Sequence, residues 1–306
     1  MSLETEALVA LRDSQTRETK PIKRLMVFLG SLAAFLLFGL LVVSASSRTT
    51  VWDLLGIVLV LFIHESGHYL SMRWLGYRDV QMFFIPFFGA AVSGYSAPMP
   101  ILQQTFVILA GPIPGICIGF ICLVFYTISG NGVWQKAASW LIFLNGLNLV
   151  SWYPLDGGRF WDLIISDRYA LLKTFLQLSM IGLGFYAYIK WFSPFLYLCM
   201  YTLFRIGRYY FVNRIAYDLR RRQVENGLSR SEVIPDEIAG VTVAQLTEKL
   251  PLLGSGKLVA EYVRDIWIRA NSERPNKYEI ALMALTYFSA LAIFIIYQFL
   301  CLPLLK

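Results

Sequence analysis

Long apolar runs alternate with short polar segments along most of the chain. A run of about 20 apolar residues is long enough to cross the hydrocarbon core of a bilayer as an α-helix. The third run carries two prolines and two glycines between Ala110 and Gly115, which predicts a kink or break. The pattern predicts about seven spans in an all-α polytopic membrane protein, at residues 25–45, 51–70, 104–129, 137–154, 174–192, 194–212 and 280–300.

The polar segments divide the chain into four parts. We expect a loosely ordered cytoplasmic tail (1–24), a six-span membrane core (25–212), a cytoplasmic polar and amphipathic segment (213–279) and a C-terminal span (280–306). In the polar segment, the capping-box pattern from Thr242 to Gln245 predicts the start of a helix. Residues 257–270 show an amphipathic helical pattern.

Residues 71–100 do not fit a clean span. Aromatic and β-branched residues between Gln81 and Tyr95 are interrupted by Pro86 and Gly89, which predicts two short strands around a turn. Because lipid cannot satisfy open backbone groups, an apolar hairpin here would be a re-entrant element that lines a cavity. The alternative is an ordinary interfacial loop.

Composition supports a membrane protein. Of the 306 residues, 57% are hydrophobic and 15% are charged, whereas a soluble domain carries about 25% charged residues. The formal charge of +7 is best explained by basic residues that flank the spans on the cytoplasmic side, and the sequence has no nucleic-acid-binding motif. All four cysteines lie in apolar runs without disulfide or zinc-site spacing, so we interpret them as small apolar residues.

Both histidines of the chain lie in one motif of the second span, His64-Glu65-Ser66-Gly67-His68. On an α-helix, residues four apart share a face with Cβ atoms about 5–6 Å apart, so two imidazoles can bind one metal ion. The alternative is a pair of core histidines. A membrane helix disfavours that alternative because ionisable side chains in hydrocarbon need partners. We therefore predict one zinc ion per chain, bound by His64 and His68.

A catalytic zinc site has three protein ligands and one open position. Asp156 is the candidate for the third ligand because it follows the fourth span and precedes two glycines. On its own, this aspartate would be interpreted as a turn residue at the interface. A cytoplasmic N-terminus places most of the 27 lysine and arginine residues in the cytoplasm. It also brings Asp156 and the histidine end of the second span to the same side of the membrane.

This set of residues is typical of peptide hydrolysis. Zinc polarises a carbonyl and lowers the pKa of a water toward about 7. Glu65 is placed beside a ligand, where it can take the water proton as a general base. A peptide bond inside a membrane must first be freed from its helix, and an edge strand of the predicted hairpin would hold it extended by β-addition.

At these motifs the chain resembles the site-2 proteases, intramembrane zinc metalloproteases that cut transmembrane segments of regulatory proteins. The resemblance covers about residues 51–160 and includes the histidine motif, Ala110-Gly111-Pro112, the predicted hairpin and the stretch from Asn148 to Gly157. It implies that the two histidines and Asp156 bind zinc and that Glu65 is the catalytic base. It also implies substrate-positioning roles for Asn148, Phe84, Pro86, Phe88 and Gly89.

The resemblance implies a membrane-anchored protein substrate as partner, alongside the lipid bilayer, and no nucleic acid. By analogy with the family, we expect a multi-pass protein of a bacterial inner or cell membrane with a cytoplasmic N-terminus. Two positions depart from the family pattern, Ser151 where proline is common and Gly115 where asparagine is common. Neither removes a metal ligand, so both concern substrate positioning.

Two other interpretations are open at this point. Another class of membrane zinc protease takes its third ligand from a Glu-x-x-x-Asp helix, and the stretch from Glu261 to Asp265 fits that spelling. A solvated helix face explains this stretch more simply. The second alternative is a non-catalytic zinc-binding scaffold or a transporter. A transporter would carry polar residues in several spans or internal repeats, whereas here the intramembrane polarity concentrates at one site.

Overall fold

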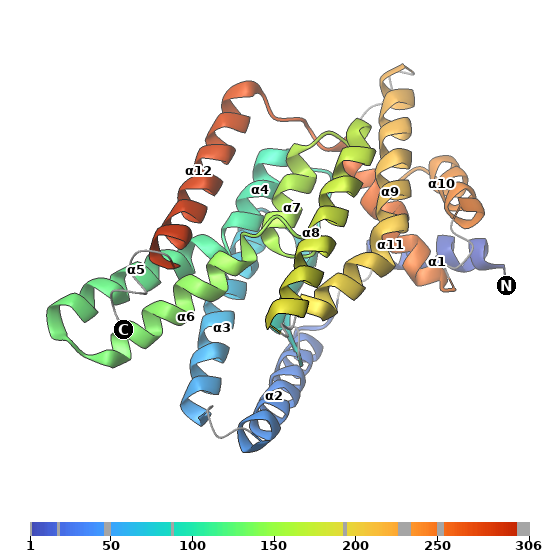
Figure 1. Ribbon diagram of the computed structural model, residues 1–306. Helices are drawn as coiled ribbons and strands as arrows, with labels where there is room; N and C mark the ends of the chain where they lie inside the picture. Colours follow the sequence, from blue (N-terminus) through green and yellow to red (C-terminus); the bar gives the residue numbers. More distant parts are fainter. Residues whose placement is uncertain are drawn as a thin grey trace.

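A computed structural model describes residues 2–16, 19–45, 50–86, 89–191, 195–225, 234–249 and 254–298. The described chain is mostly helical and contains a two-stranded sheet (Figure 1). In chain order the elements are α1 (Leu3–Thr16), α2 (Pro21–Ala45), α3 (Val51–Trp74), β1 (Arg78–Ile85), β2 (Gly89–Tyr95), α4 (Ile101–Leu109), α5 (Pro112–Ser129), α6 (Gly132–Asn148), α7 (Asp156–Ile164), the 3₁₀ turn η1 (Asp167–Tyr169), α8 (Ala170–Trp191), α9 (Phe195–Glu225), α10 (Asp236–Lys249), α11 (Gly256–Asn271) and α12 (Lys277–Ile296).

Within the described residues, four segments are long and apolar enough to cross a membrane. They correspond to the first, second, third and seventh predicted spans and cover 21–44, 51–74, 101–129 and 277–296. Helices α6, α8 and α9 lie where the other three spans were expected. The count of seven therefore stays a prediction.

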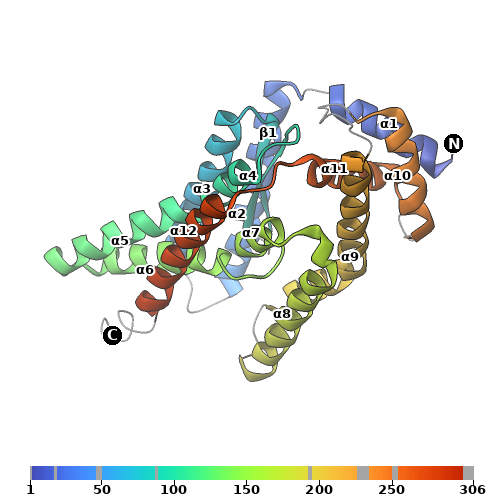
Figure 2. The same ribbon diagram turned by 90° about the horizontal axis from the view of Figure 1, so that it is seen from above.

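The third span is broken, as its glycines and prolines predicted. Helix α4 ends at Leu109, and α5 begins at Pro112, where a proline lacks only an N–H that the first turn of a helix leaves unpaired anyway. Helices α5 and α6 then run side by side, away from the rest of the molecule (Figures 1 and 2). The break at Ala110-Gly111 lies against α3, the helix that carries both histidines.

The predicted hairpin is confirmed. Strands β1 and β2 pair antiparallel, with Phe84 opposite Ala90. Gly89 opens the second strand with a φ of 103°, a backbone conformation that favours glycine. The Phe84 side chain is buried among Phe28 and Phe35 of α2, so the hairpin is held against α2 by aromatic packing.

Two helix boundaries differ most from the expected spans. Helix α6 ends at Asn148 and not at 154, because the chain leaves the helix there and turns back before α7. Helix α9 continues past 212 to Glu225. Its apolar face continues through Val212, Ile215 and Ala216, which are all buried. Packing of these residues stabilises the helix beyond the predicted edge of the membrane core.

The prediction of a loosely ordered N-terminal tail is wrong for residues 3–16, which form α1. Ala7 and Leu11, one helical turn apart, are buried in a hydrophobic cluster with residues of α9, α10 and α11. Figure 2 shows α1, α10 and α11 together at the end of the molecule opposite to α5. The packed partners lie more than 200 residues away in sequence, so local pattern alone gives little sign of this helix.

The helix start predicted at Thr242 is also wrong. Helix α10 begins six residues earlier, at Asp236, with two acidic residues in its first turn, where they interact favourably with the helix dipole. Thr242 lies inside the helix, and its hydroxyl donates to the Ile238 carbonyl. The amphipathic helix expected over 257–270 is present as α11.

A buried charge network joins α7 to the helices around it. The Asp162 carboxylate, 5% exposed, accepts hydrogen bonds from Lys173 of α8, Tyr209 of α9 and Arg269 of α11. The Lys173 ammonium also donates to Asp167 at 2.8 Å. Buried charges are stable only when paired, so this network fixes α7 relative to three other helices.

Candidate metal centre

The two histidines lie on one face of α3, as the four-residue spacing predicted. The helix begins with a capping box in which Thr50 and Asp53 bond to each other's backbone N–H groups. His64 and His68 are 4% and 6% exposed. Their Nε2 atoms lie 3.1 Å apart, close enough for both to contact one ion.

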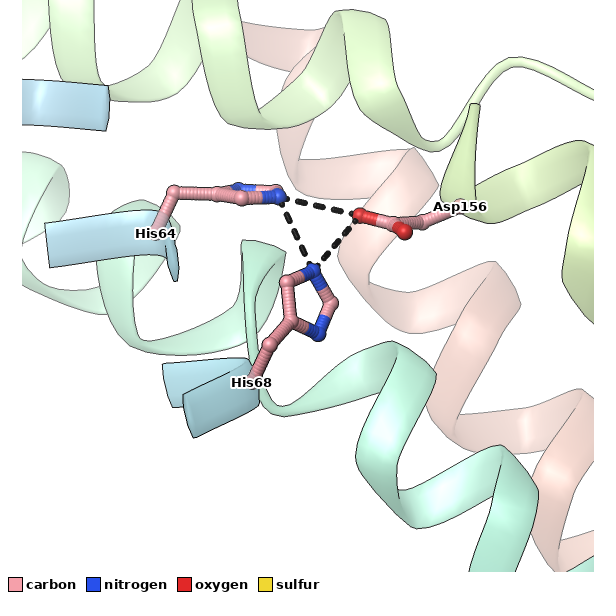
Figure 3. A group of neighbouring side chains, drawn as sticks. All are labelled: His64, His68 and Asp156. Atoms are coloured by element: carbon pink, nitrogen blue, oxygen red, sulfur yellow. Dashed lines mark hydrogen bonds and ion pairs between the residues drawn. The ribbon is translucent and has the colours of Figure 1, made fainter. Parts of the chain in front are cut away.

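Asp156 reaches the same point from a second helix. It is the first residue of α7 and is buried. Its Oδ2 atom lies 3.0 Å from the Nε2 of His64 and 3.2 Å from the Nε2 of His68. Figure 3 shows the three side chains pointing toward one another, with the carboxylate opposite both rings. Among the described residues, these three form the histidine, cysteine or acidic group that could hold a metal ion.

Hydrogen bonds to the outer ring nitrogens fix which face each imidazole presents. The Nδ1 of His68 lies 2.8 Å from the Val107 carbonyl oxygen, and the Nδ1 of His64 lies 2.8 Å from the Oδ1 of Asn145. Both partners are acceptors, so each Nδ1 carries a proton, and in the neutral imidazole each Nε2 then has a lone pair. Two lone pairs and a carboxylate oxygen therefore converge, an arrangement that a cation stabilises.

The donor set fits zinc. Imidazole nitrogen and carboxylate oxygen are common zinc ligands, and bonds of about 2.0–2.2 Å in a tetrahedron separate neighbouring donors by about 3.3–3.6 Å. The three separations in this protein, from 3.0 to 3.2 Å, are close to that value. Three protein ligands leave a fourth position for water or substrate, as in catalytic sites.

Close backbone packing explains the glycine inside the histidine motif. A Cβ on Gly67 would lie 1.8 Å from the Ala110 carbonyl oxygen, so only glycine allows α3 to contact the break between α4 and α5. A glycine in a helix interior costs about 1 kcal/mol relative to alanine. The contact places His68 next to Val107 of α4, whose carbonyl orients its ring.

The turn before Asp156 is held from two sides. A Cβ on Gly157 would lie 2.2 Å from the Leu149 carbonyl oxygen, so the start of α7 packs directly on the end of α6. From α12, the Tyr287 hydroxyl donates to the same carbonyl. The Tyr287 ring stacks on Phe160, one turn into α7, with centroids 4.3 Å apart. The C-terminal helix thus supports the segment that carries the third candidate ligand.

Glu65 lies beside the group formed by the two histidines and Asp156. It is buried, at 6% exposed, and its carboxylate interacts electrostatically with both histidines and with Asp156. A carboxylate in this position is available to exchange a proton with a water at the centre.

Unlike the three candidate ligands, the residues expected to position substrate do not converge on the candidate metal centre. Phe84 packs in the core against α2. Pro86 and Gly89 lie at the hairpin turn, and Phe88 lies outside the described residues. Asn148 donates to the Leu144 carbonyl within its own helix.

The sequence analysis did not predict a role for Asn145, the asparagine that contacts His64. It is fully buried and lies one helical turn before Asn148. A second amide in an otherwise apolar run is a signal that was available, since a buried polar side chain needs a partner.

Residues 52–137 match the family model of peptidase family M50. The matched stretch contains the histidine motif of α3. Over this stretch the chain is similar to peptidase family M50, the family that the histidine motif resembles. Among the described residues, four apolar segments long enough to cross a membrane agree with an integral membrane protein.

Two curated proteins are similar to part of the chain. The chain is 27% identical over 157 residues to zinc metalloprotease MJ0392 of Methanocaldococcus jannaschii, which covers 48% of this chain and 45% of the relative. It is 28% identical over 125 residues to stage IV sporulation protein FB of Bacillus subtilis, covering 40% of this chain and 43% of the relative. The matched part thus spans less than half the length of either relative.

Proposed function

We propose that this protein is an intramembrane zinc protease of the M50 type that cuts peptide bonds within or next to transmembrane segments of membrane-anchored proteins. The observation that carries the proposal is the convergence of three acceptor atoms from α3 and α7, within 3.2 Å of one another. Glu65 lies on the same helix as two of them. The proposed ligands of one zinc ion are His64, His68 and Asp156.

The chemistry follows from the residues around this point. Bound zinc would polarise the scissile carbonyl and lower the pKa of a water molecule toward about 7. The Glu65 carboxylate would accept a proton from the attacking water and return it to the leaving amide nitrogen. Asn145 and the Val107 carbonyl would hold the rings in place through their Nδ1 atoms.

Strand β2 lies where an extended substrate could be held beside these residues. A Cβ on Gly89 would lie 3.5 Å from Leu61, and one on Gly94 would lie 3.5 Å from Met72. The strand therefore runs along α3 past the level of His64 and His68. We propose that its outer edge binds the substrate as an added strand, which would expose a peptide bond that a helix hides.

The pairing of the hairpin supports the outer edge of β2 as the edge that binds substrate. The Phe84 N–H donates to the Ser31 hydroxyl of α2, so the outer edge of β1 is already covered. That bond also means that the Phe84–Ala90 pair is a non-hydrogen-bonded pair of the ladder. The N–H groups of Ala90 and, two residues on, of Val92 therefore point to the outer edge of β2.

Glu261 and Asp265, the alternative ligand pair, do not lie beside the two histidines. Glu261 lies on α11, where it lines a cavity of about 480 Å³ together with residues of α1 and the hairpin. Asp265, one turn on, bonds to Arg269. The Asp156 carboxylate lies within 3.2 Å of the Nε2 atoms of both histidines, which supports it over the Glu-x-x-x-Asp helix as the third ligand. A non-catalytic scaffold has no need of a buried carboxylate beside its ligands, and Glu65 argues against that alternative.

We further propose that the N-terminus is cytoplasmic and that the protein resides in a bacterial cell membrane. The basic residues of the chain support this orientation. The proposed partner is a membrane-anchored protein.

The test uses Glu65→Gln in the native membrane. We expect membrane proteins with single spans to accumulate uncut in cells that carry Glu65→Gln, while the purified variant retains zinc. If the membrane proteomes of wild type and Glu65→Gln contain the same full-length and truncated species, the protease proposal fails.

A further inference from the structure

We propose that Asn145 is a positioning residue, which fixes the His64 imidazole for metal binding, and that Gly115 provides the space its amide requires. The inference rests on the zinc site of the proposed function. It assigns a role to one residue that sequence reasoning missed and to one that departs from the family pattern.

Both ends of the Asn145 amide are engaged. Its Nδ2 donates to the Leu141 carbonyl at 2.8 Å, one turn earlier on α6. A carbonyl only accepts, so this bond determines which end of the amide is nitrogen. The Oδ1 must then be the atom 2.8 Å from the His64 Nδ1, and it can only accept a proton from that ring.

This contact selects one tautomer and one orientation of His64. With its proton on Nδ1, the ring presents a lone pair on Nε2, the atom that faces His68 and Asp156. Histidines that bind metals usually donate their other N–H to an oxygen, and loss of that partner lowers metal affinity about 10–100-fold. The hydrogen-bond acceptor of His68 is a backbone carbonyl. The acceptor of His64 is the Asn145 side chain, which a mutation can remove.

Gly115 of α5 faces this amide. A Cβ there would lie 2.2 Å from the Asn145 Nδ2, 2.4 Å from its Cγ and 2.5 Å from its Oδ1. Any side chain at 115 would therefore displace the Asn145 amide as a whole. Because a side chain can move where backbone cannot, alanine at 115 should act on the site by shifting Asn145 and not by separating the helices.

The test measures zinc affinity of purified, metal-free protein by competition with a chelator. Asn145→Leu keeps the approximate size of the side chain but removes the acceptor, and Asn145→Asp keeps an acceptor. We expect Asn145→Leu to lose about 10–100-fold in zinc affinity and Asn145→Asp to remain near wild type.

Gly115→Ala should weaken zinc binding as well. In the Gly115→Ala/Asn145→Ala double variant, the loss should be no larger than in Asn145→Ala alone, because the clash has been removed.

A control separates orientation of His64 from general weakening of α6. Ile142, fully buried on the same helix, packs against α5, so Ile142→Ala should lower the unfolding temperature of the metal-free protein and leave zinc affinity unchanged.

Three results would overturn the inference: unchanged affinity in Asn145→Leu, equal losses in Asn145→Leu and Asn145→Asp, or additive losses in the double variant. Failure of wild type to bind zinc is a different result, because it removes the proposed function itself.

Discussion

Tyr287 of α12 stacks on Phe160 of α7 with ring centroids 4.3 Å apart and an interplanar angle of 11°. Its hydroxyl donates to the Leu149 carbonyl at the end of α6. One side chain from the C-terminal helix therefore contacts the segments on both sides of the turn that leads to Asp156. The proposed third ligand depends on a helix that lies outside the stretch matched to family M50.

Tyr287 should accordingly matter for both stability and metal binding. Tyr287→Phe keeps the stacked ring and should cost about 1 kcal/mol for the lost hydrogen bond. Tyr287→Ala leaves a cavity and should cost about 3–5 kcal/mol, with weaker zinc binding because the Asp156 turn loosens. Thermal unfolding and chelator competition measure both effects. An alanine variant with the stability and zinc affinity of wild type would show that α12 does not support the turn.

Gly67→Ala should disrupt the contact between α3 and the α4–α5 break. Its Cβ would meet the Ala110 carbonyl oxygen at 1.8 Å, and backbone atoms on both sides leave little room to adjust. We expect a loss of about 1–3 kcal/mol or more and a loss of zinc. At Gly30, in α2, a Cβ would have no neighbouring atom within 4 Å, so Gly30→Ala is the matched control. It should be neutral or stabilising by up to about 1 kcal/mol, and equal behaviour of the two variants would contradict the packing argument.

A proline on the outer edge of β2 tests the proposed substrate strand. Val92→Pro removes an N–H that points away from β1, so the hairpin and the zinc should persist while cleavage is lost. Ala91→Pro removes an N–H that pairs with β1 and should destabilise the hairpin. Zinc content, thermal unfolding and accumulation of uncut membrane proteins distinguish the two variants. Normal cleavage by Val92→Pro would exclude strand addition at this edge.

The buried network around α7 predicts a pH dependence of stability. Burial alone would raise the pKa of Asp162, but Arg269 and Lys173 outweigh it and hold that pKa well below its usual range. A carboxylate with a lowered pKa in the folded state stabilises the fold above its unfolded pKa of about 3.9. That contribution is lost as the pH falls below about 4 toward the lower folded pKa.

Asp162→Asn should therefore unfold more easily at neutral pH and lose less of its remaining stability on acidification. Breaking a buried pair costs about 3–5 kcal/mol. The surface pair of Arg214 and Asp218, at 3.7 Å with both side chains about half exposed, provides the control. Asp218→Asn should cost less than about 1 kcal/mol. Parallel acid-unfolding curves for wild type and Asp162→Asn would contradict the assignment.

Much of the site could be predicted from the sequence because its signals are local. The spacing of His64 and His68 places both rings on one face whatever surrounds the helix. Thr50 and Asp53 cap α3 through their own backbone, and Gly89 opens β2 with a positive φ. The break between α4 and α5 follows from the covalent structure of proline and glycine.

The features that were missed depend on partners distant in sequence. Helix α1 is stabilised by packing on α11, and its own sequence is mixed in polarity. The sequence at Thr242 fits a helix N-cap, but the helix begins at Asp236 and Thr242 lies in its interior. Asn145 contacts a histidine 81 residues earlier in the sequence. In each case tertiary packing decides between structures that the local sequence allows.

The most direct test of the account is the zinc content of three purified proteins, measured by mass spectrometry of the metal. Wild type should carry one zinc ion per chain, Asp156→Ala should lose it, and Glu261→Ala should keep it. Retention of zinc by Asp156→Ala, or its loss from Glu261→Ala, would show that the metal is not held between α3 and α7.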